Sequence, residues 1–208
     1  MTLKLNGSSS GYTAIDAPAA AGSNTLVLPP NNGSAGQVLQ TDGNGGLTWV
    51  DPPGIDVIDT YRKTDSTTGD QEPITGTWER EDETTSVLLG GGISQSSGVF
   101  TFPKTGMYFI KFHCKWSIQG SERYADTLIQ TSTDGSSFQN AAKVGGSISS
   151  AVDSAATVQT TTCSCLFDVE DTNHAVRVAA NFGNNSVSIN GNSDISETYV
   201  QFIRLAGT

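Results

Sequence analysis

The stretch MYFIKFHCKWSI, residues 107–118, alternates between two kinds of side chain with a period of two. Its even-numbered positions are Tyr108, Ile110, Phe112, Cys114, Trp116 and Ile118, and its odd-numbered positions include Phe109, Lys111, His113, Lys115 and Ser117. Because successive side chains of a β-strand point to opposite faces, this pattern predicts one long strand. We expect its even-numbered side to lie in the core of the protein.

Other stretches with the same period lie on both sides of this one, and helical periodicity is hard to find after residue 54. They are SGVFTFP (97–103), YADTLIQTST (124–133), TTTCSCLFDV (160–169), HAVRVAANF (174–182) and ETYVQFIRL (197–205). Roughly eight to ten short strands with turn residues between them are typical of an all-β sandwich. We therefore predict an all-β head domain over residues 55–208.

The last predicted strand is apolar on both of its faces. One face holds Tyr199, Ile203 and Leu205, and the other holds Val200 and Phe202. A strand that is apolar on both sides is usually covered on both sides, whereas a two-layer sandwich covers only one. We therefore predict that another subunit covers the second face, and that Phe109 and His113 of the 107–118 strand join this contact.

Residues 1–54 differ in composition from the rest of the chain. About half of them are Gly, Ser, Thr, Asn or Pro, and the apolar residues come in short bursts such as TLVL, QVL and LTWV. Burial of so small a number of apolar side chains is not enough to offset the conformational entropy that the segment loses when it becomes ordered. The segment is therefore either a flexible linker or an anchor whose short strands complete their core with neighbouring copies or a partner protein. Under the anchor interpretation, the buried residues would be Leu26, Leu28, Val38, Leu39, Leu47 and Trp49.

The charge of the chain argues against several classes of partner. Lys and Arg number 11 against 21 Asp and Glu, which gives a formal net charge of −10. Without a basic cluster, nucleic-acid binding through phosphate neutralisation is not expected.

The start of the chain has no apolar stretch of signal-peptide type, and no apolar run is long enough to span a bilayer. We accordingly expect no membrane insertion.

The sequence offers little for catalysis. It contains two histidines, His113 and His174, and no Gly-x-Ser-x-Gly motif, so we predict no enzyme, no catalytic residues and no cofactor. Asp168, Glu170 and Asp171 share one turn and are the only candidate calcium ligands, with a solvated acidic turn as the alternative.

The chain has three cysteines, an odd number. Cys114, Cys163 and Cys165 are expected to be buried free thiols, although a disulfide between neighbouring strands is conceivable.

The segment GVFTFPKTGMYFIKF, residues 98–112, resembles the signature of the complement-type globular head and tumour necrosis factor (TNF) superfamily. Gly98, Phe100, Pro103, Gly106 and Tyr108 occupy the matching places, and Ile110 stands where that superfamily often has Phe. The resemblance covers roughly residues 57–207. It implies a ten-stranded jelly roll that assembles as a homotrimer, and the predicted trimer interface is Phe109, His113, Tyr199, Ile203 and Leu205.

A second resemblance involves residues 12–51. Their Leu-Pro-Pro, Gly-x-Val-Leu-x-x-Asp-Gly and Leu-x-Trp pieces are similar to the N-terminal segment of many bacteriophage tail-fibre and appendage proteins, especially those of phages of marine bacteria. In that family the segment is associated with attachment to the virion and with trimerisation. The resemblance implies that residues 1–54 bind other virion proteins after synthesis in the cytoplasm of a bacterial host.

Together these patterns predict a structural virion protein. It would be a trimeric fibre that displays a jelly-roll head for attachment to a glycan or protein of the host surface. A head fibre or decoration protein on the capsid is the first alternative. A secreted, lectin-like adhesion module is the alternative from another class.

Overall fold

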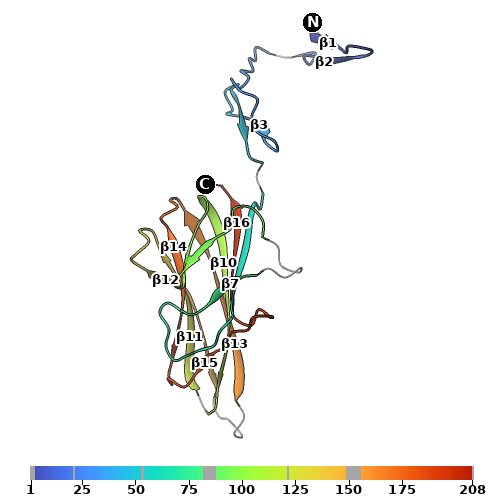
Figure 1. Cartoon of the computed structure of the whole chain (residues 1–208). Helices are drawn as coiled ribbons and strands as arrows, with labels where there is room; N and C mark the ends of the chain where they lie inside the picture. Colours follow the sequence, from blue (N-terminus) through green and yellow to red (C-terminus); the bar gives the residue numbers. More distant parts are fainter. Residues whose placement is uncertain are drawn as a thin grey trace. The chain divides into compact units, whose positions relative to one another are not determined.

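The computed structural model of the chain describes residues 3–20, 22–52, 54–81, 88–120, 122–148 and 156–207 (Figure 1). Its elements are strands joined by loops, and the chain divides into two compact units, Met1–Pro52 and Pro53–Thr208. We call the first unit the leader and the second the head. Within the described ranges, no helix is long and apolar enough to cross a membrane.

The head is a sandwich of two antiparallel sheets. The first sheet runs in the order β6 (Thr67–Thr68), β15 (Ser188–Ile189), β10 (Gly106–Ile118), β16 (Tyr199–Ala206), β5 (Val57–Lys63) and β7 (Trp78–Arg80), and β13 (Thr157–Val169) pairs with the other side of β10. The second sheet runs in the order β12 (Gln139–Ile148), β11 (Glu122–Ser132), β14 (Ala175–Phe182), β9 (Val99–Thr101) and β8 (Ser94–Ser96). This architecture confirms the predicted all-β sandwich. Within the described residues of the head, the two-residue strands β6 and β15 come in addition to ten longer strands, the number expected.

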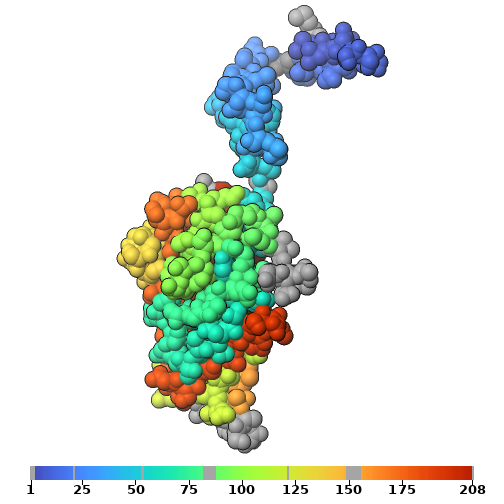
Figure 2. All heavy atoms as spheres, viewed as in Figure 1, coloured from blue at the N-terminus to red at the C-terminus, as the bar shows by residue number. Residues whose placement is uncertain are grey.

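Strand β10 supplies the centre of the core, and its burial alternates residue by residue as the sequence predicts. Tyr108, Ile110, Phe112, Cys114 and Trp116 are completely buried. Val176, Val178 and Phe182 of the second sheet belong to the same core. In the space-filling view the atoms of the head close over this interior (Figure 2).

Phe100 is the centre of an aromatic cluster in the core. Its ring lies 5.3 Å from that of Phe202 and 5.6 Å from those of Tyr61 and Trp78, measured between centroids. The edge-on and tilted geometries are those that aromatic pairs favour. Phe202 therefore points inward, together with Val200, and the opposite face of β16 points away from the core.

The leader consists of two separate hairpins. Strands β1 (Leu3–Asn6) and β2 (Tyr12–Ile15) form one, and β3 (Val38–Thr41) and β4 (Leu47–Val50) form the other. A turn joins β3 to β4, in which the Asp42 carboxylate accepts hydrogen bonds from the Asn44 and Gly46 amides. None of the described residues of the leader is buried, so these hairpins do not enclose a core.

Candidate functional site: the outward face of the first sheet

An apolar row crosses the first sheet on the face that points away from the core. The strand register places Leu166 of β13 opposite Phe109 of β10, Phe109 opposite Ile203 of β16, and Ile203 opposite Ile58 of β5. A β-bridge then joins Ile58 to Leu89. Leu166 and Leu89 are exposed, and the three residues between them are partly exposed. We call these five residues the apolar row.

A polar row lies next to the apolar row, two residues further along each strand. It contains Ser164, Lys111, Gln201 and Thr60, again in direct cross-strand register. The Lys111 ammonium lies 5.4 Å from the centre of the Tyr199 ring, a cation–π distance. The Gln201 side-chain amide donates a hydrogen bond to the Thr60 hydroxyl over 3.4 Å.

The third row is built around His113. Its register partners are Thr162 on β13 and Tyr199 on β16, and Tyr199 in turn lies opposite Arg62. The His113 ring stacks on Tyr199 with 5.2 Å between centroids, and its Nδ1 lies 2.7 Å from the Thr162 hydroxyl oxygen. Burial, and then the nearby Lys111 charge, lower the pKa of His113 below its usual value. The imidazole is therefore mostly neutral at pH 7.

Most of the predicted interface residues come together on this face. Phe109, His113, Tyr199 and Ile203 lie on the two adjacent strands β10 and β16. Leu205 is exposed and lies at a register shift between β10 and β16, where Met107 pairs with Ala206 and Tyr108 pairs with Arg204. It is therefore not aligned with the other predicted residues. That these residues form an interface stays a prediction.

Sequence reasoning missed three members of the apolar row: Leu166, Ile58 and Leu89. A signal was present for Leu166, because it is the apolar residue on the otherwise polar side of TTTCSCLFDV. No pattern within one segment could align Ile58 and Leu89 with Phe109, because that alignment depends on strand order and register.

The three acidic calcium candidates do not converge. Asp168 belongs to β13 and lies opposite Met107, whereas Glu170 and Asp171 are exposed. The Asp171 carboxylate accepts a hydrogen bond from the Asn173 amide over 2.8 Å and so caps its own turn. In the described parts of the chain, no three His, Cys, Asp or Glu side chains are grouped as metal ligands.

All three cysteines are free thiols. They lie on the neighbouring strands β10 and β13, but Cys114 is opposite Thr161 and Cys163 is opposite Phe112, so the sulfurs are not direct register partners. Burial raises the pKa of Cys114 and Cys163 to about 12 and that of Cys165 to about 11. Such thiols carry almost no thiolate at neutral pH and are poor nucleophiles.

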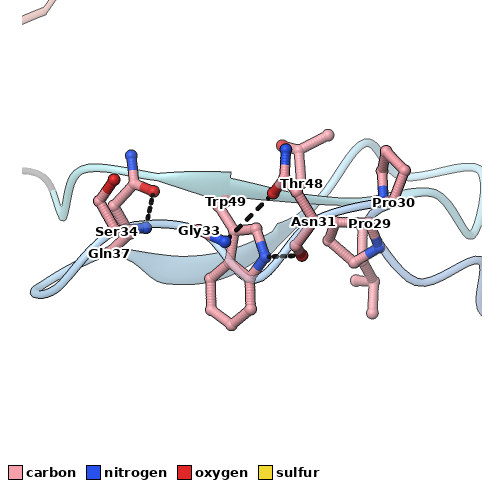
Figure 3. Close-up of a pocket in the computed structure, with 9 residues that line it drawn as sticks. Pro29, Pro30, Asn31, Gly33, Ser34, Gln37, Thr48 and Trp49 are labelled. Carbon is pink, nitrogen blue, oxygen red and sulfur yellow. Dashed lines mark hydrogen bonds between the residues drawn. The ribbon is translucent and has the colours of Figure 1, made fainter.

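The leader contains a pocket of about 450 Å³ beside Trp49 (Figure 3). The Trp49 indole nitrogen donates a hydrogen bond to the Asn31 carbonyl over 2.9 Å. Gly33 lies so close to the indole ring that a side chain there would collide with it. Pro29, Pro30 and Leu47 also line the pocket.

The predicted anchor residues of the leader differ in exposure. Trp49 and Leu47 are partly buried, whereas Val38 and Leu39 are exposed, and Leu26 and Leu28 are exposed by 67% and 70%. Within one copy of the chain, these side chains do not form a common core. The anchor role stays a prediction.

No protein-family model matches the chain, and no curated protein matches it either. Solved structures do match it. Among them is the structure of Eiger TNF from S. frugiperda, with a TM-score of 0.55, 9% sequence identity, and coverage of 74% of this chain and 95% of that one.

The head has a TNF-like jelly-roll fold. The matched structure confirms the part of the sequence resemblance that concerned the fold, and at 9% identity it shows the fold alone. It gives no support to the tail-fibre resemblance of the leader.

The lowered pKa of His113 predicts a pH dependence of stability. As the pH falls below about 6.5, the unfolded chain takes up a proton at this position before the folded head does, so folding loses stability. Urea unfolding at about pH 7.5 and about pH 5 is expected to show a smaller loss of stability on acidification in His113→Asn than in the wild type. An equal loss in both proteins would contradict this assignment.

Proposed function

We propose that the chain is a non-enzymatic structural protein that works as a homotrimer. The observation that carries this proposal is the apolar row, which runs from Leu166 on β13 across the sheet to Leu89 beyond β5. Contiguous apolar surface of this kind marks an interaction site, because covering it releases roughly 25 cal/mol per Å². The TNF-like fold supports the proposal, since the resemblance to that superfamily implies trimers.

The two ends of the apolar row favour a ring of copies. Leu166 lies on β13 at one side of the sheet, and Ile58 and Leu89 lie at the other. In a ring, one end of the row packs against the opposite end of the row in the next copy, and the rotation closes after a fixed number of copies. Three copies are the number that the fold-level resemblance implies.

Among the described residues of this face, the pair that most resembles a catalytic group is His113 with the Thr162 hydroxyl. A histidine acts as a general base when a carboxylate orients its second nitrogen beside an exposed nucleophile. In the part of the chain that the structure describes, no carboxylate hydrogen bonds to this ring, and the ring instead stacks on Tyr199. The geometry therefore favours an assembly surface over an active site.

We further propose that the leader attaches the trimer to a bacteriophage particle. Two observations support this proposal: the ordered tail-fibre motifs of residues 12–51, and apolar side chains such as Leu26 and Leu28 that one copy leaves exposed. On this account the protein is a virion appendage assembled in the host cytoplasm. It either binds the host surface as a fibre or decorates the capsid.

Light scattering is expected to give about three times the chain mass of 21.7 kDa for the full-length protein. Phe109→Asp should reduce the mass towards that of a monomer while the circular dichroism spectrum stays that of a β-sandwich, because Phe109 lies outside the core. Tyr124→Asp, on the exposed side of β11, is the matched control and should remain trimeric. A monomeric wild type at micromolar concentration would contradict the proposal.

Removal of residues 1–52 is expected to leave a folded, trimeric head that no longer joins the particle. The full chain should bind parent phage particles that lack it, and the truncated head should not. If the protein is a fibre, an excess of it should also block adsorption to host cells, whereas a capsid protein should leave adsorption unchanged. Incorporation of the truncated head would show that the anchor proposal is wrong.

A further inference from the structure

Two residues of opposite charge, Lys111 and Glu81, lie towards opposite edges of the outward face of the head. Lys111 lies on β10, next to the β13 edge, and Glu81 directly follows β7 at the opposite edge. The Glu81 amide donates a hydrogen bond to the Thr60 carbonyl over 2.9 Å, which extends the pairing of β5 with β7 by one residue pair. Since Thr60 belongs to the polar row, Glu81 lies at the end of the same row as Lys111.

Within the described ranges, neither Lys111 nor Glu81 has an ionic partner, and for a cation of the head this is unusual. Most other cations of the head do have one: the pairs are Arg62–Glu79, Lys63–Asp65, Arg80–Asp59, Lys104–Asp56, Lys115–Glu197, Lys143–Asp126, Arg177–Glu72 and Arg204–Asp56. The recorded contact of the Lys111 ammonium is the face of Tyr199. An ammonium and a carboxylate thus remain unpaired in one row, at opposite sides of the face.

The contacts of the neighbouring residues show to which side of the sheet Glu81 points. The neighbouring Arg80 points to the core side, where its guanidinium bonds the buried Asp59 carboxylate at 3.0 Å and the Ile93 carbonyl at 2.6 Å. Because side chains alternate along a strand, Glu79 and Glu81 both point to the outward side. Glu79 is already paired with Arg62 at 3.2 Å, and this leaves Glu81 as the available carboxylate.

A ring of copies brings these two sides together. Consider a ring of copies whose rotation axis runs parallel to the strands. Rotation about this axis does not move a residue along the axis, so each cross-strand row meets the same row of the next copy. Leu166 and Phe109 would then pack against Ile58 and Leu89 of the neighbouring copy, so both ends of the apolar row would be covered. In the adjacent polar row, Lys111 would face Glu81.

We propose that Lys111 of one copy forms an ion pair with Glu81 of the next copy. This inference rests on the proposed homotrimer and adds the direction and register of its contact. Covering Lys111 without an opposite charge would leave a buried ammonium unpaired, which is strongly unfavourable. The pair removes that cost, and it also rejects the reversed orientation of two copies, in which like charges would meet.

A charge-swap series on the full-length chain tests the proposal. Lys111→Glu and Glu81→Lys are each expected to raise the dissociation constant of the trimer by about tenfold or more, measured by sedimentation equilibrium. The double variant Lys111→Glu/Glu81→Lys should regain most of the lost affinity, because the pair is restored with its charges exchanged. The difference between wild type and single variants should shrink at high salt.

The controls separate this inference from the proposed trimer. Lys143→Glu on the second sheet and Glu170→Lys in the acidic turn make the same charge changes elsewhere and should leave the affinity unchanged. Lys111→Met and Glu81→Gln, which add no repulsion, should weaken the trimer less than the reversals. If a reversal variant unfolds, as judged by circular dichroism, these neutral variants carry the test through a double-mutant cycle, in which a coupling of zero overturns the ion pair.

The possible outcomes differ for the two claims. A trimeric wild type together with single reversals that have no effect, or a double variant no better than the singles, would overturn the ion pair and leave the trimer standing. A monomeric wild type would overturn both. Rescue in the charge-swapped double variant supports the ion pair, as does a favourable coupling between Lys111→Met and Glu81→Gln in the double-mutant cycle.

Discussion

The two faces of strand β10 constrain the rest of the structure. Its even-numbered side chains fill the core, and this fixes the first sheet against the second. The same alternation forces Phe109, Lys111 and His113 outward, where they align with residues of β13 and β16. Because the period of a strand is two, the core cannot form without also creating the outward face. The proposed assembly surface is therefore a direct consequence of how the core is packed.

The two units of the chain differ in how far their apolar residues are buried. The head buries an aromatic cluster around Phe100 and leaves the apolar row on its outward face. The leader encloses no core in its described residues and leaves Leu26 and Leu28 exposed. Isolated two-stranded hairpins are at best marginally stable in water. The proposed attachment to other chains would supply the leader with the stabilising contacts that a single copy lacks.

The sequence was sufficient for the local features and insufficient for those that depend on register. The alternation in residues 107–118 predicted the core side of β10, and the apolar character of both sides of β16 predicted a face outside the core. Which side of β16 turns inward was decided by the packing of Val200 and Phe202. Leu166, Ile58 and Leu89 align with Phe109 only through strand order. The acidic candidates are neighbours in the chain, but Asp168 belongs to β13 while Glu170 and Asp171 follow it, and the three do not converge. Neither fact can be read from spacing along the chain.

A homotrimer that is held together by the apolar row requires this row to be covered in solution. Hydroxyl-radical footprinting of the full-length protein can compare Leu166 in this row with Ile195 in a loop, because in a single copy the two side chains are exposed by 62% and 64%. We expect Leu166 to be protected from oxidation at concentrations where the protein is assembled, while Ile195 reacts freely. Equal oxidation of the two side chains would contradict this expectation.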